Sequence, residues 1–308
     1  MVDVSIIIVS FNTRDLLRKC LMSLQSGANG ISSETFVVDN ASDDGSAEMV
    51  EQEFRDVRLI RNDTNRGFAA ANNIAMSQTS GRYIVLLNSD TEASQDAIPT
   101  LVHFMDDRPS VGYCGPRLVN KDGSHQASAR RFPTVLSGAY SILGLTSRRV
   151  NSRHTLDLHL ARGDRDDFAA DWLSGACLLV RSDVVAQIGQ LDEGFFLYFE
   201  ETDWCQRMAN AGWEGWFVSA AEVIHLGGQS VRGDGDGRPF SGDHPVYWVR
   251  SRRRYMRRYH GWFGMWLSET IEVVLYAAIW LRHRWRRGQR SRAKAKSAAL
   301  AIRYMLAA

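Results

Sequence analysis

Short polar side chains and glycines follow several apolar, β-branched runs of this sequence. The run YIVLL, for example, leads straight into Asn-Ser-Asp, so that an apparently buried strand ends in the carboxylate of Asp90. Polar ends of this kind occur at SFN (10–12), VVDNASDDGS (37–46), NRGFAAANN (65–73) and LNSDT (87–91). An aspartate such as Asp39 can accept a hydrogen bond from the imide N–H of a nucleobase, and a small turn after it lets backbone N–H groups approach a ligand.

The elements around these polar ends indicate how they would be brought together. Residues 4–10 and 35–39 read as strands, and the segment 13–26 between them places its leucines and Cys20 on one helical face. A helix at 46–54, a strand at 57–62, a helix at 68–79 and a strand at 83–90 repeat the pattern. Parallel sheets built from such βαβ units bind ligands at the carboxyl ends of their strands, where the polar residues lie.

The second half of the sequence is less regular. Its expected elements are a helix at 97–107, a strand at 111–119, a long loop or lid at 120–168, a strand and helix at 171–189, a helix at 195–212, one or two closing strands at 213–225, and a mobile Gly-rich linker at 227–245.

The ordered strand ends resemble the motifs of family 2 inverting glycosyltransferases, and within them the rhamnosyltransferase-type enzymes of bacterial cell-wall and surface-polysaccharide assembly. The resemblance covers about residues 3–262. It implies the α/β GT-A fold, a Rossmann-like and mostly parallel sheet flanked by helices. It also implies a nucleotide-sugar site comprising Ser10, Asn12, Asp39, Asn40, Asn65, Arg66, Gly67, Asn72, Asn88 and Ser89.

In this family Asp39 would read a uracil or thymine base, and Asn12 with residues 65–67 would line the diphosphate. Asp90 is the only carboxylate at the position of the family's metal-binding DxD motif, and the resemblance makes His225 a second ligand for Mn²⁺ or Mg²⁺. A metal held there can neutralise a diphosphate leaving group, and an imidazole ligand suits Mn²⁺ better. The competing interpretations are helix caps for the strand-end residues and a structural hydrogen-bonding role for His225.

A second group of motifs, at 172–180 and 192–207, resembles the family's acceptor side. Inverting transfer needs a carboxylate base near the acceptor hydroxyl, and the family's signature assigns this role to Glu201, with Asp203 and Glu200 as alternatives. Trp172, Ser174 and Gly175, together with Glu200, are expected to form the acceptor site. The alternatives are an acid cluster that stabilises a helix N-terminus and a Trp172 that only fills the core.

The charge distribution divides the chain. Residues 246–308 contain 15 Lys and Arg against Glu269 and Glu272, whereas residues 1–245 carry a net charge of −11. Aromatic residues flank the apolar segment 262–281 within this basic tail, which predicts amphipathic helices on an anionic membrane surface. Whether 262–281 spans the bilayer or lies on it is open. Packing on the protein itself or on a second copy, as in a homo-oligomer, is the alternative, and nucleic acid is the least favoured partner.

Four scattered cysteines and an N-terminus without a basic leader favour a cytoplasmic protein, peripheral on the inner face of the cell membrane. The expected organisation is a nucleotide-sugar-binding half at 1–95, an acceptor-binding and catalytic half at 96–245, and the basic tail at 246–308. The expected reaction moves a sugar, first choice L-rhamnose from dTDP-rhamnose, to a polyprenyl-diphosphate-linked or polysaccharide acceptor. The alternatives are a UDP-sugar transferase, a nucleotidyltransferase of similar fold, and a non-catalytic scaffold that binds nucleotide sugar or membrane.

Overall fold

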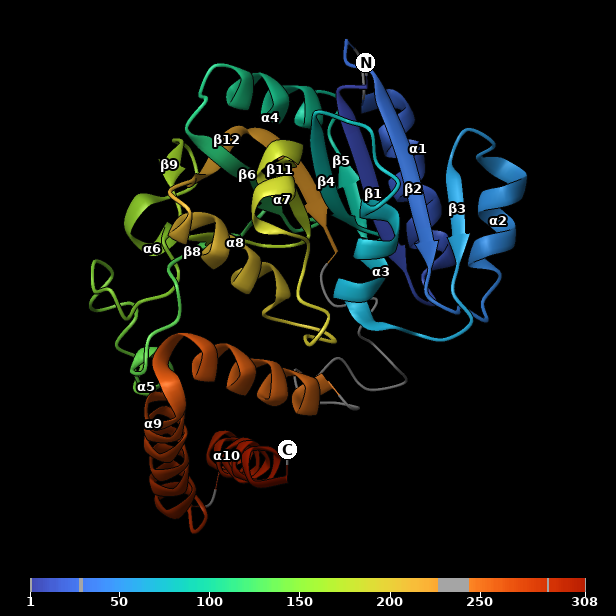
Figure 1. Cartoon of the computed structure of the whole chain (residues 1–308). Helices are drawn as coiled ribbons and strands as arrows, with labels where there is room; N and C mark the ends of the chain where they lie inside the picture. Colours follow the sequence, from blue (N-terminus) through green and yellow to red (C-terminus); the bar gives the residue numbers. More distant parts are fainter. Residues whose placement is uncertain (1, 28–29, 227–243, 287, 308) are drawn as a thin grey trace.

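A computed structural model describes residues 2–27, 30–226, 244–286 and 288–307. Its centre is a mixed sheet in which neighbouring strands follow the order β3-β2-β1-β4-β11-β6-β12-β5. The strands β3, β2, β1 and β4 are parallel to one another, and β11 runs antiparallel to both β4 and β6. Helices cover both faces of this sheet, and the C-terminal helices lie beneath it in Figure 1.

The first half forms the predicted βαβ units. Its elements are β1 (Val4–Ser10), α1 (Arg14–Gly27), β2 (Ser33–Asp39), α2 (Ser46–Glu53), β3 (Arg58–Arg61), α3 (Gly67–Met76), β4 (Tyr83–Asn88) and β5 (Thr91–Ala93). Val4 and the isoleucines of β1 are buried and Val9 is half-buried, so both faces of the strand are covered, as expected for a central parallel strand. Alternate residues of β1 and β2 therefore enter two separate apolar clusters, one on each side of the sheet.

The second half completes the sheet and adds small elements beside it. They are α4 (Ala97–Asp106), β6 (Val111–Val119), β7 (His125–Gln126), β8 (Ala129–Arg130), α5 (Ser137–Ile142), α6 (His159–Arg162), β9 (Phe168–Ala169), β10 (Trp172–Leu173), β11 (Cys177–Arg181), α7 (Ser182–Ile188), α8 (Glu200–Asn210) and β12 (Glu214–His225).

Two expectations for this half need adjustment. The segment 120–168 is mostly irregular, as predicted, but it contains the short elements β7, β8, α5 and α6. The helix expected at 195–212 begins only at Glu200, because Tyr198 and Phe199 adopt positive φ angles of 70° and 68° that no α-helix contains. The predicted linker lies largely in residues 227–243, outside the described residues.

The basic tail forms two helices, α9 (His244–His283) and α10 (Gln289–Ala307). Gly261 adopts a non-helical φ of 69° and divides α9 into two arms, which Figure 1 shows turning sharply from one another. The first arm packs on the main domain, since Tyr255 and Met256 are buried with Phe195. Both arms pack against α10, because Val249 of the first arm and Tyr276 of the second cluster with its Met305.

Ion pairs fix both arms of α9. Arg254 and Arg258 of the first arm both contact Asp192 at 2.9 and 2.8 Å. Arg252 pairs with the buried Glu272, while Arg253 lies 2.6 Å from Glu269. Both acids of the tail are therefore neutralised within the protein. The predicted division at residue 245 separates segments that pack tightly together.

Candidate active site

The carboxyl ends of β1, β2 and β4 meet at one edge of the sheet. Ser10 lies opposite Asp39 in the β1–β2 register, and Asn88 lies opposite Val9 in the β1–β4 register. The side chains of Ser10, Asp39 and Ser89 are buried behind this edge, whereas Asn88 is half-buried. The structure thus brings the predicted strand-end residues together.

Hydroxyl groups link the ends of β1 and β4. Ser10 Oγ and Thr13 Oγ1 lie 2.9 Å apart, and Thr13 Oγ1 donates to Ser89 Oγ at 2.9 Å. Thr13, also buried, was not among the predicted site residues, although its place in the SFNT turn was a usable signal. These hydrogen bonds hold the turn after β1 against the turn that carries Asp90.

Only one of the two carboxylate oxygens of Asp39 accepts a hydrogen bond within the protein. Its Oδ2 accepts a hydrogen bond from the Ser42 backbone N–H at 3.0 Å, while Oδ1 is buried without a hydrogen-bond partner. The neighbouring Asn12 has a positive φ of 53°, and its Oδ1 accepts from Asp43 N–H. A buried acceptor without a partner is costly, so a ligand donor such as an imide N–H would satisfy Oδ1.

Asn40 organises the turn that contains Asn65, Arg66 and Gly67. Its Nδ2 donates to Asn65 Oδ1 at 2.8 Å, and its Oδ1 accepts from the Arg66 backbone N–H at 3.0 Å. Gly67 has φ 80°, and a Cβ atom there would lie 2.4 Å from the Phe196 carbonyl oxygen, so only glycine fits. Asn40 therefore supports the site rather than presenting free polar atoms, while the Arg66 side chain is exposed.

Asn72 lies one turn further along α3. Its Nδ2 donates to the Phe68 carbonyl at 2.8 Å, but its Oδ1 is buried without a partner. It shares this property with Asp39, which is consistent with a place in a polar site.

Asp90 and His225 lie together where β4 and β12 end. His225 Nε2 is 3.4 Å from Asp90 Oδ1 and 3.5 Å from Asn88 Nδ2. On its other side, His225 Nδ1 is 2.6 Å from Gln126 Oε1. An amide oxygen can only accept, so Nδ1 carries a proton and Nε2 is the ring nitrogen that faces Asp90.

This donor set fits a divalent cation. An imidazole nitrogen and a carboxylate oxygen that lie this close can both be ligands of one cation. The hydrogen bond from Nδ1 to Gln126 is the outer-sphere contact typical of metal-ligating histidines. Among the described residues no group of three or more His, Cys, Asp or Glu side chains could hold a metal, so other ligands would have to come from substrate and water.

Glu200 and Glu201 form an acid pair at the start of α8, in which Glu200 is buried and Glu201 is half-buried. Burial, with the charge of Glu201 adding to it, raises the pKa of Glu200 well above its usual value. Burial also raises the pKa of Glu201 to about 7, although nearby Arg130 opposes the shift. The Oε2 atoms of both glutamates are buried without hydrogen-bond partners. An acid with a pKa near 7 is well matched to proton transfer at neutral pH.

The predicted acceptor residues adjoin Glu201. A Cβ atom on Gly175 would lie 3.6 Å from Glu201 Cβ, so this glycine brings the loop 174–176 against the acid. The Ala176 carbonyl accepts from the Asn88 N–H at 2.9 Å, which joins the same loop to the end of β4. Trp172 is half-buried with Arg130 over its ring, and its indole N–H donates to the Arg131 carbonyl. Arg130 had no recognisable motif around it in the sequence.

Asp203 differs from its two neighbours. It is fully buried, its Oδ1 accepts from Arg258 at 2.6 Å and from Tyr259 at 2.9 Å, and its Oδ2 accepts from Arg207 at 2.9 Å. Two residues correspond to about 200° of helix rotation, so Asp203 projects away from the side that carries Glu201. Its Oδ1 therefore joins α8 to α9, while its Oδ2 pairs with Arg207 within α8.

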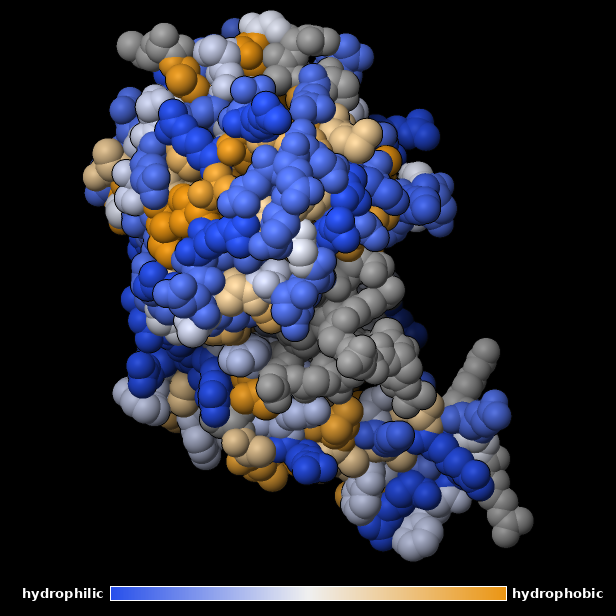
Figure 2. Space-filling model, turned by 90° about the vertical axis from the view of Figure 1, so that its right-hand side faces the viewer, coloured by the Kyte–Doolittle hydropathy of each residue, from blue (hydrophilic) through white to orange (hydrophobic). Residues whose placement is uncertain are grey.

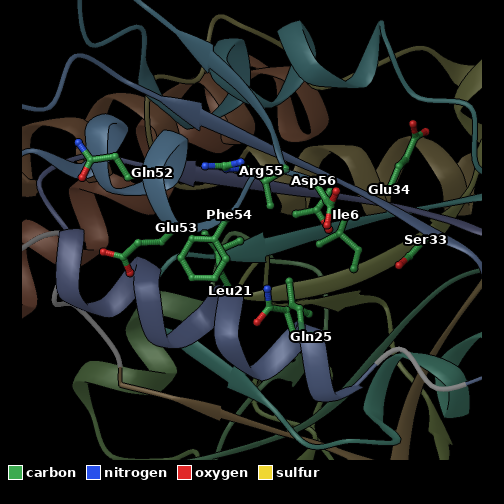
Figure 3. A pocket seen from close by; sticks show the side chains of 13 residues that line it. Ile6, Leu21, Gln25, Ser33, Glu34, Gln52, Glu53, Phe54, Arg55 and Asp56 are labelled. Carbon is green, nitrogen blue, oxygen red and sulfur yellow. The ribbon is translucent and has the colours of Figure 1, made fainter.

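A cavity of about 520 Å³ lies at the opposite edge of the sheet (Figure 3). It is bounded by the end of α1, the start of β2 and the segment after α2, including Gln25, Ser33 and Phe54. This cavity adjoins the amino ends of the strands, whereas the polar site lies at their carboxyl ends. Cavity volume alone therefore does not locate the polar site.

The sequence model of glycosyl transferase family 2 matches residues 5–185, more than half of the chain, and the chain belongs to this family. Its relatives include the N-acetylglucosaminyl-diphospho-decaprenol L-rhamnosyltransferase of Mycobacterium tuberculosis, 28% identical over 96% of this chain and 98% of that protein. The rhamnosyltransferase WbbL of Escherichia coli is 25% identical over 83% of this chain and 93% of its own length.

Solved structures confirm the GT-A fold. A mannosyltransferase of Pyrobaculum calidifontis in complex with GDP-Man and Mn²⁺ superposes with a TM-score of 0.59, at 14% identity, over 98% of this chain and 86% of that one. GalNAc-T7 with UDP, GalNAc and Mn²⁺ gives a TM-score of 0.61, at 14% identity, over 99% and 55%. The protein is thus a family 2 glycosyltransferase that uses nucleotide sugars and resembles bacterial rhamnosyltransferases.

Proposed function

We propose that the protein transfers L-rhamnose from dTDP-rhamnose to a polyprenyl-diphosphate-linked acceptor sugar, with inversion, in a single displacement. The rhamnosyltransferases among its relatives support this donor, and the full-length similarity to the mycobacterial enzyme supports this acceptor class. A UDP-sugar donor and a polysaccharide acceptor are the alternatives within the same chemistry.

The proposed base is Glu201. It would remove the proton from the acceptor hydroxyl as the hydroxyl oxygen bonds to C1 of the donor sugar and the bond from C1 to the diphosphate oxygen breaks. The observation that carries this assignment is a buried carboxyl group with a pKa of about 7 and an oxygen without a hydrogen-bond partner, joined through the loop 174–176 to the strand end near Asp90.

The donor would lie along the strand ends. Asp39 Oδ1 would accept the imide N–H of thymine, while Asn12, Asn65 and Arg66 would lie beside the diphosphate. Asp90 and His225 would hold Mn²⁺ or Mg²⁺, which would supply neutralisation of the charge that develops on the leaving nucleoside diphosphate.

The tail is proposed to hold the enzyme on the inner leaflet of the cell membrane. The described residues contain one helix, within α9, that is long and apolar enough to cross a bilayer. The kink at Gly261 and the paired acids favour helices that lie on the surface instead. Exposed Trp262, Phe263 and Trp266 beside the many arginines suit a bilayer interface, and Figure 2 shows apolar and charged side chains intermixed over these helices.

Thermal shift of the full-length protein tests the donor site. It would be measured with dTDP, UDP, GDP and CDP, each with Mn²⁺, Mg²⁺ or EDTA, and with Asp90→Ala in parallel. Ligand at 100 times its dissociation constant adds about 2.7 kcal/mol, which is easily measured. Stabilisation by dTDP that needs metal and disappears in Asp90→Ala supports the proposal. Stabilisation by UDP alone would change the donor, and no shift with any nucleotide would contradict an intact donor site.

A further inference from the structure

A second cavity, of about 380 Å³, lies where the C-terminal helices meet the main domain. Its walls come from α5, from both arms of α9, from α10 and from the turn before α8. This volume falls within the range of small-ligand sites. None of the residues proposed above for donor, metal or base lines it.

The walls of this cavity are mainly apolar. They include Ile142, Leu156, Phe199, Trp248, Met256 and Met305. The charged groups in the wall, Arg252 and Glu272, pair with each other and with Ser268, so they do not require a polar ligand. Gly138 of α5 has no room for a side chain against Glu272, which fixes this wall. A sugar or a nucleotide would lose its hydration here without gaining partners, whereas a hydrocarbon chain would not.

The cavity is connected to the acid pair through Tyr198 and Phe199. Both residues line it and directly precede Glu200 in the chain. Both have left-handed backbone angles, an unusual state for two consecutive aromatic residues that is often found at functional sites. Burial raises the pKa of Tyr198, and the nearby charges of Glu200 and Glu201 add to the shift, so this wall residue of the cavity lies close to the acid pair.

We propose that this cavity binds the first part of the isoprenoid chain of the lipid-linked acceptor. The inference rests on the proposed function, because it extends the acceptor site from the reacting sugar to the lipid beyond its diphosphate. The chain would leave a membrane contacted by α9 and α10, enter between these helices, and pass Phe199 with its diphosphate directed toward Glu201. The cavity then selects acceptors by their hydrocarbon part, independently of their sugar.

Calorimetric titration of the full-length protein in EDTA tests this site with farnesyl diphosphate and inorganic diphosphate as probes. EDTA removes any binding of diphosphate through a metal at Asp90. Burial of the isoprenoid chain predicts affinity for farnesyl diphosphate at least about tenfold higher than for inorganic diphosphate. Equal affinity for the two probes, or no binding of farnesyl diphosphate, overturns the proposal.

Variants at Ser141 locate the binding. Ser141 is exposed at the rim on α5, so Ser141→Trp would fill the cavity without disturbing the core, and it should weaken farnesyl diphosphate binding by about tenfold or more. Ser141→Ala and Gln25→Trp, which places the same indole side chain in the cavity of Figure 3, should change binding by less than about twofold. Unchanged binding in Ser141→Trp overturns the site.

Photo-crosslinking of the unmodified protein provides an independent measurement. A farnesyl diphosphate analogue with a diazirine on its chain should label peptides from 133–142 and 245–256, and labelling confined to other segments would contradict the proposal. The thermal shift with nucleotides separates a failure of the proposed donor chemistry from a failure of the lipid site. If it fails while farnesyl diphosphate binds, the proposed donor chemistry is wrong and the lipid site stands; if it succeeds while farnesyl diphosphate does not bind, only the lipid site falls.

Discussion

Two carboxylates on the first turn of α8 have opposite surroundings. Glu201 is enclosed beside Gly175 with an oxygen that lacks a partner, and its pKa is raised to about 7. Asp203, two residues later, is surrounded by Arg207, Arg258 and Tyr259. Glu201 keeps a carboxylate oxygen without a hydrogen-bond partner, while Asp203 joins α8 to α9.

This contrast shows how one short acidic motif serves two purposes. Helix rotation sends the two side chains in different directions, so a single turn supplies both a candidate base and an anchor for α9. Glu201, whose pKa is raised to about 7, can exchange a proton near neutral pH, whereas Asp203 serves as the anchor.

The largest effect is expected from Glu201→Gln. Loss of the base should lower kcat by about 10²–10⁴-fold while metal-dependent nucleotide binding persists, because the donor contacts are elsewhere. Transfer from radiolabelled donor and thermal shift with nucleotide measure the two quantities. Glu201→Asp keeps a carboxylate and should retain more activity than Glu201→Gln. Near-normal transfer by Glu201→Gln would show that Glu201 is not the base and would contradict the contrast drawn between Glu201 and Asp203.

Asp203→Ala should chiefly destabilise the fold. The change leaves Arg207 and Arg258 without their buried partner, which predicts a loss of about 3–5 kcal/mol in the free energy of unfolding. Urea denaturation measures it, with Asp183→Ala, an exposed acid on α7, as the control. A stable Asp203→Ala variant without transferase activity would instead make Asp203 a catalytic residue.

The pH profile should reflect Glu201. A base must be ionised, so kcat/KM should rise with pH and level off above about 7, in accordance with the raised pKa. Binding of the intact nucleotide sugar, measured over the same range, separates a change in chemistry from a change in affinity. A rate that stays flat from pH 5 to pH 8 would argue against this acid as the base.

The smallest effect concerns stability at Glu200. A carboxyl whose pKa is raised on folding binds more protons in the folded state, so stability falls as pH rises from its unfolded value through the folded one. Glu200→Gln removes this dependence and should increase the free energy of unfolding by about 1 kcal/mol or more at pH 8, with less effect at pH 4. Denaturation curves at the two pH values measure this change, with Glu214→Gln as control. An equal change in the free energy of unfolding at pH 4 and pH 8 would contradict a raised pKa at Glu200.

Sequence patterns predicted the first half of the chain better than the second half. Strands β1 to β4 have uniform apolar runs and polar ends, so their alignment follows from βαβ geometry alone. The partner of His225 could not be predicted, because Gln126 lies in a stretch without periodicity. The distinction between Glu201 and Asp203 also escaped prediction, since it depends on Arg258, which lies 55 residues further along the chain on α9.

The bend at Gly261 has a consequence for substrate length. Ion pairs with Asp192 and Asp203 hold the first arm of α9 on the main domain. The second arm turns away from the first at Gly261 (Figure 1). If the second arm lies on a bilayer as proposed, α9 fixes the distance between the proposed base and the lipid headgroups. Acceptors whose reacting sugar stands one or two sugar units higher would then be excluded by distance alone, so the enzyme would add its sugar at a single stage of chain growth.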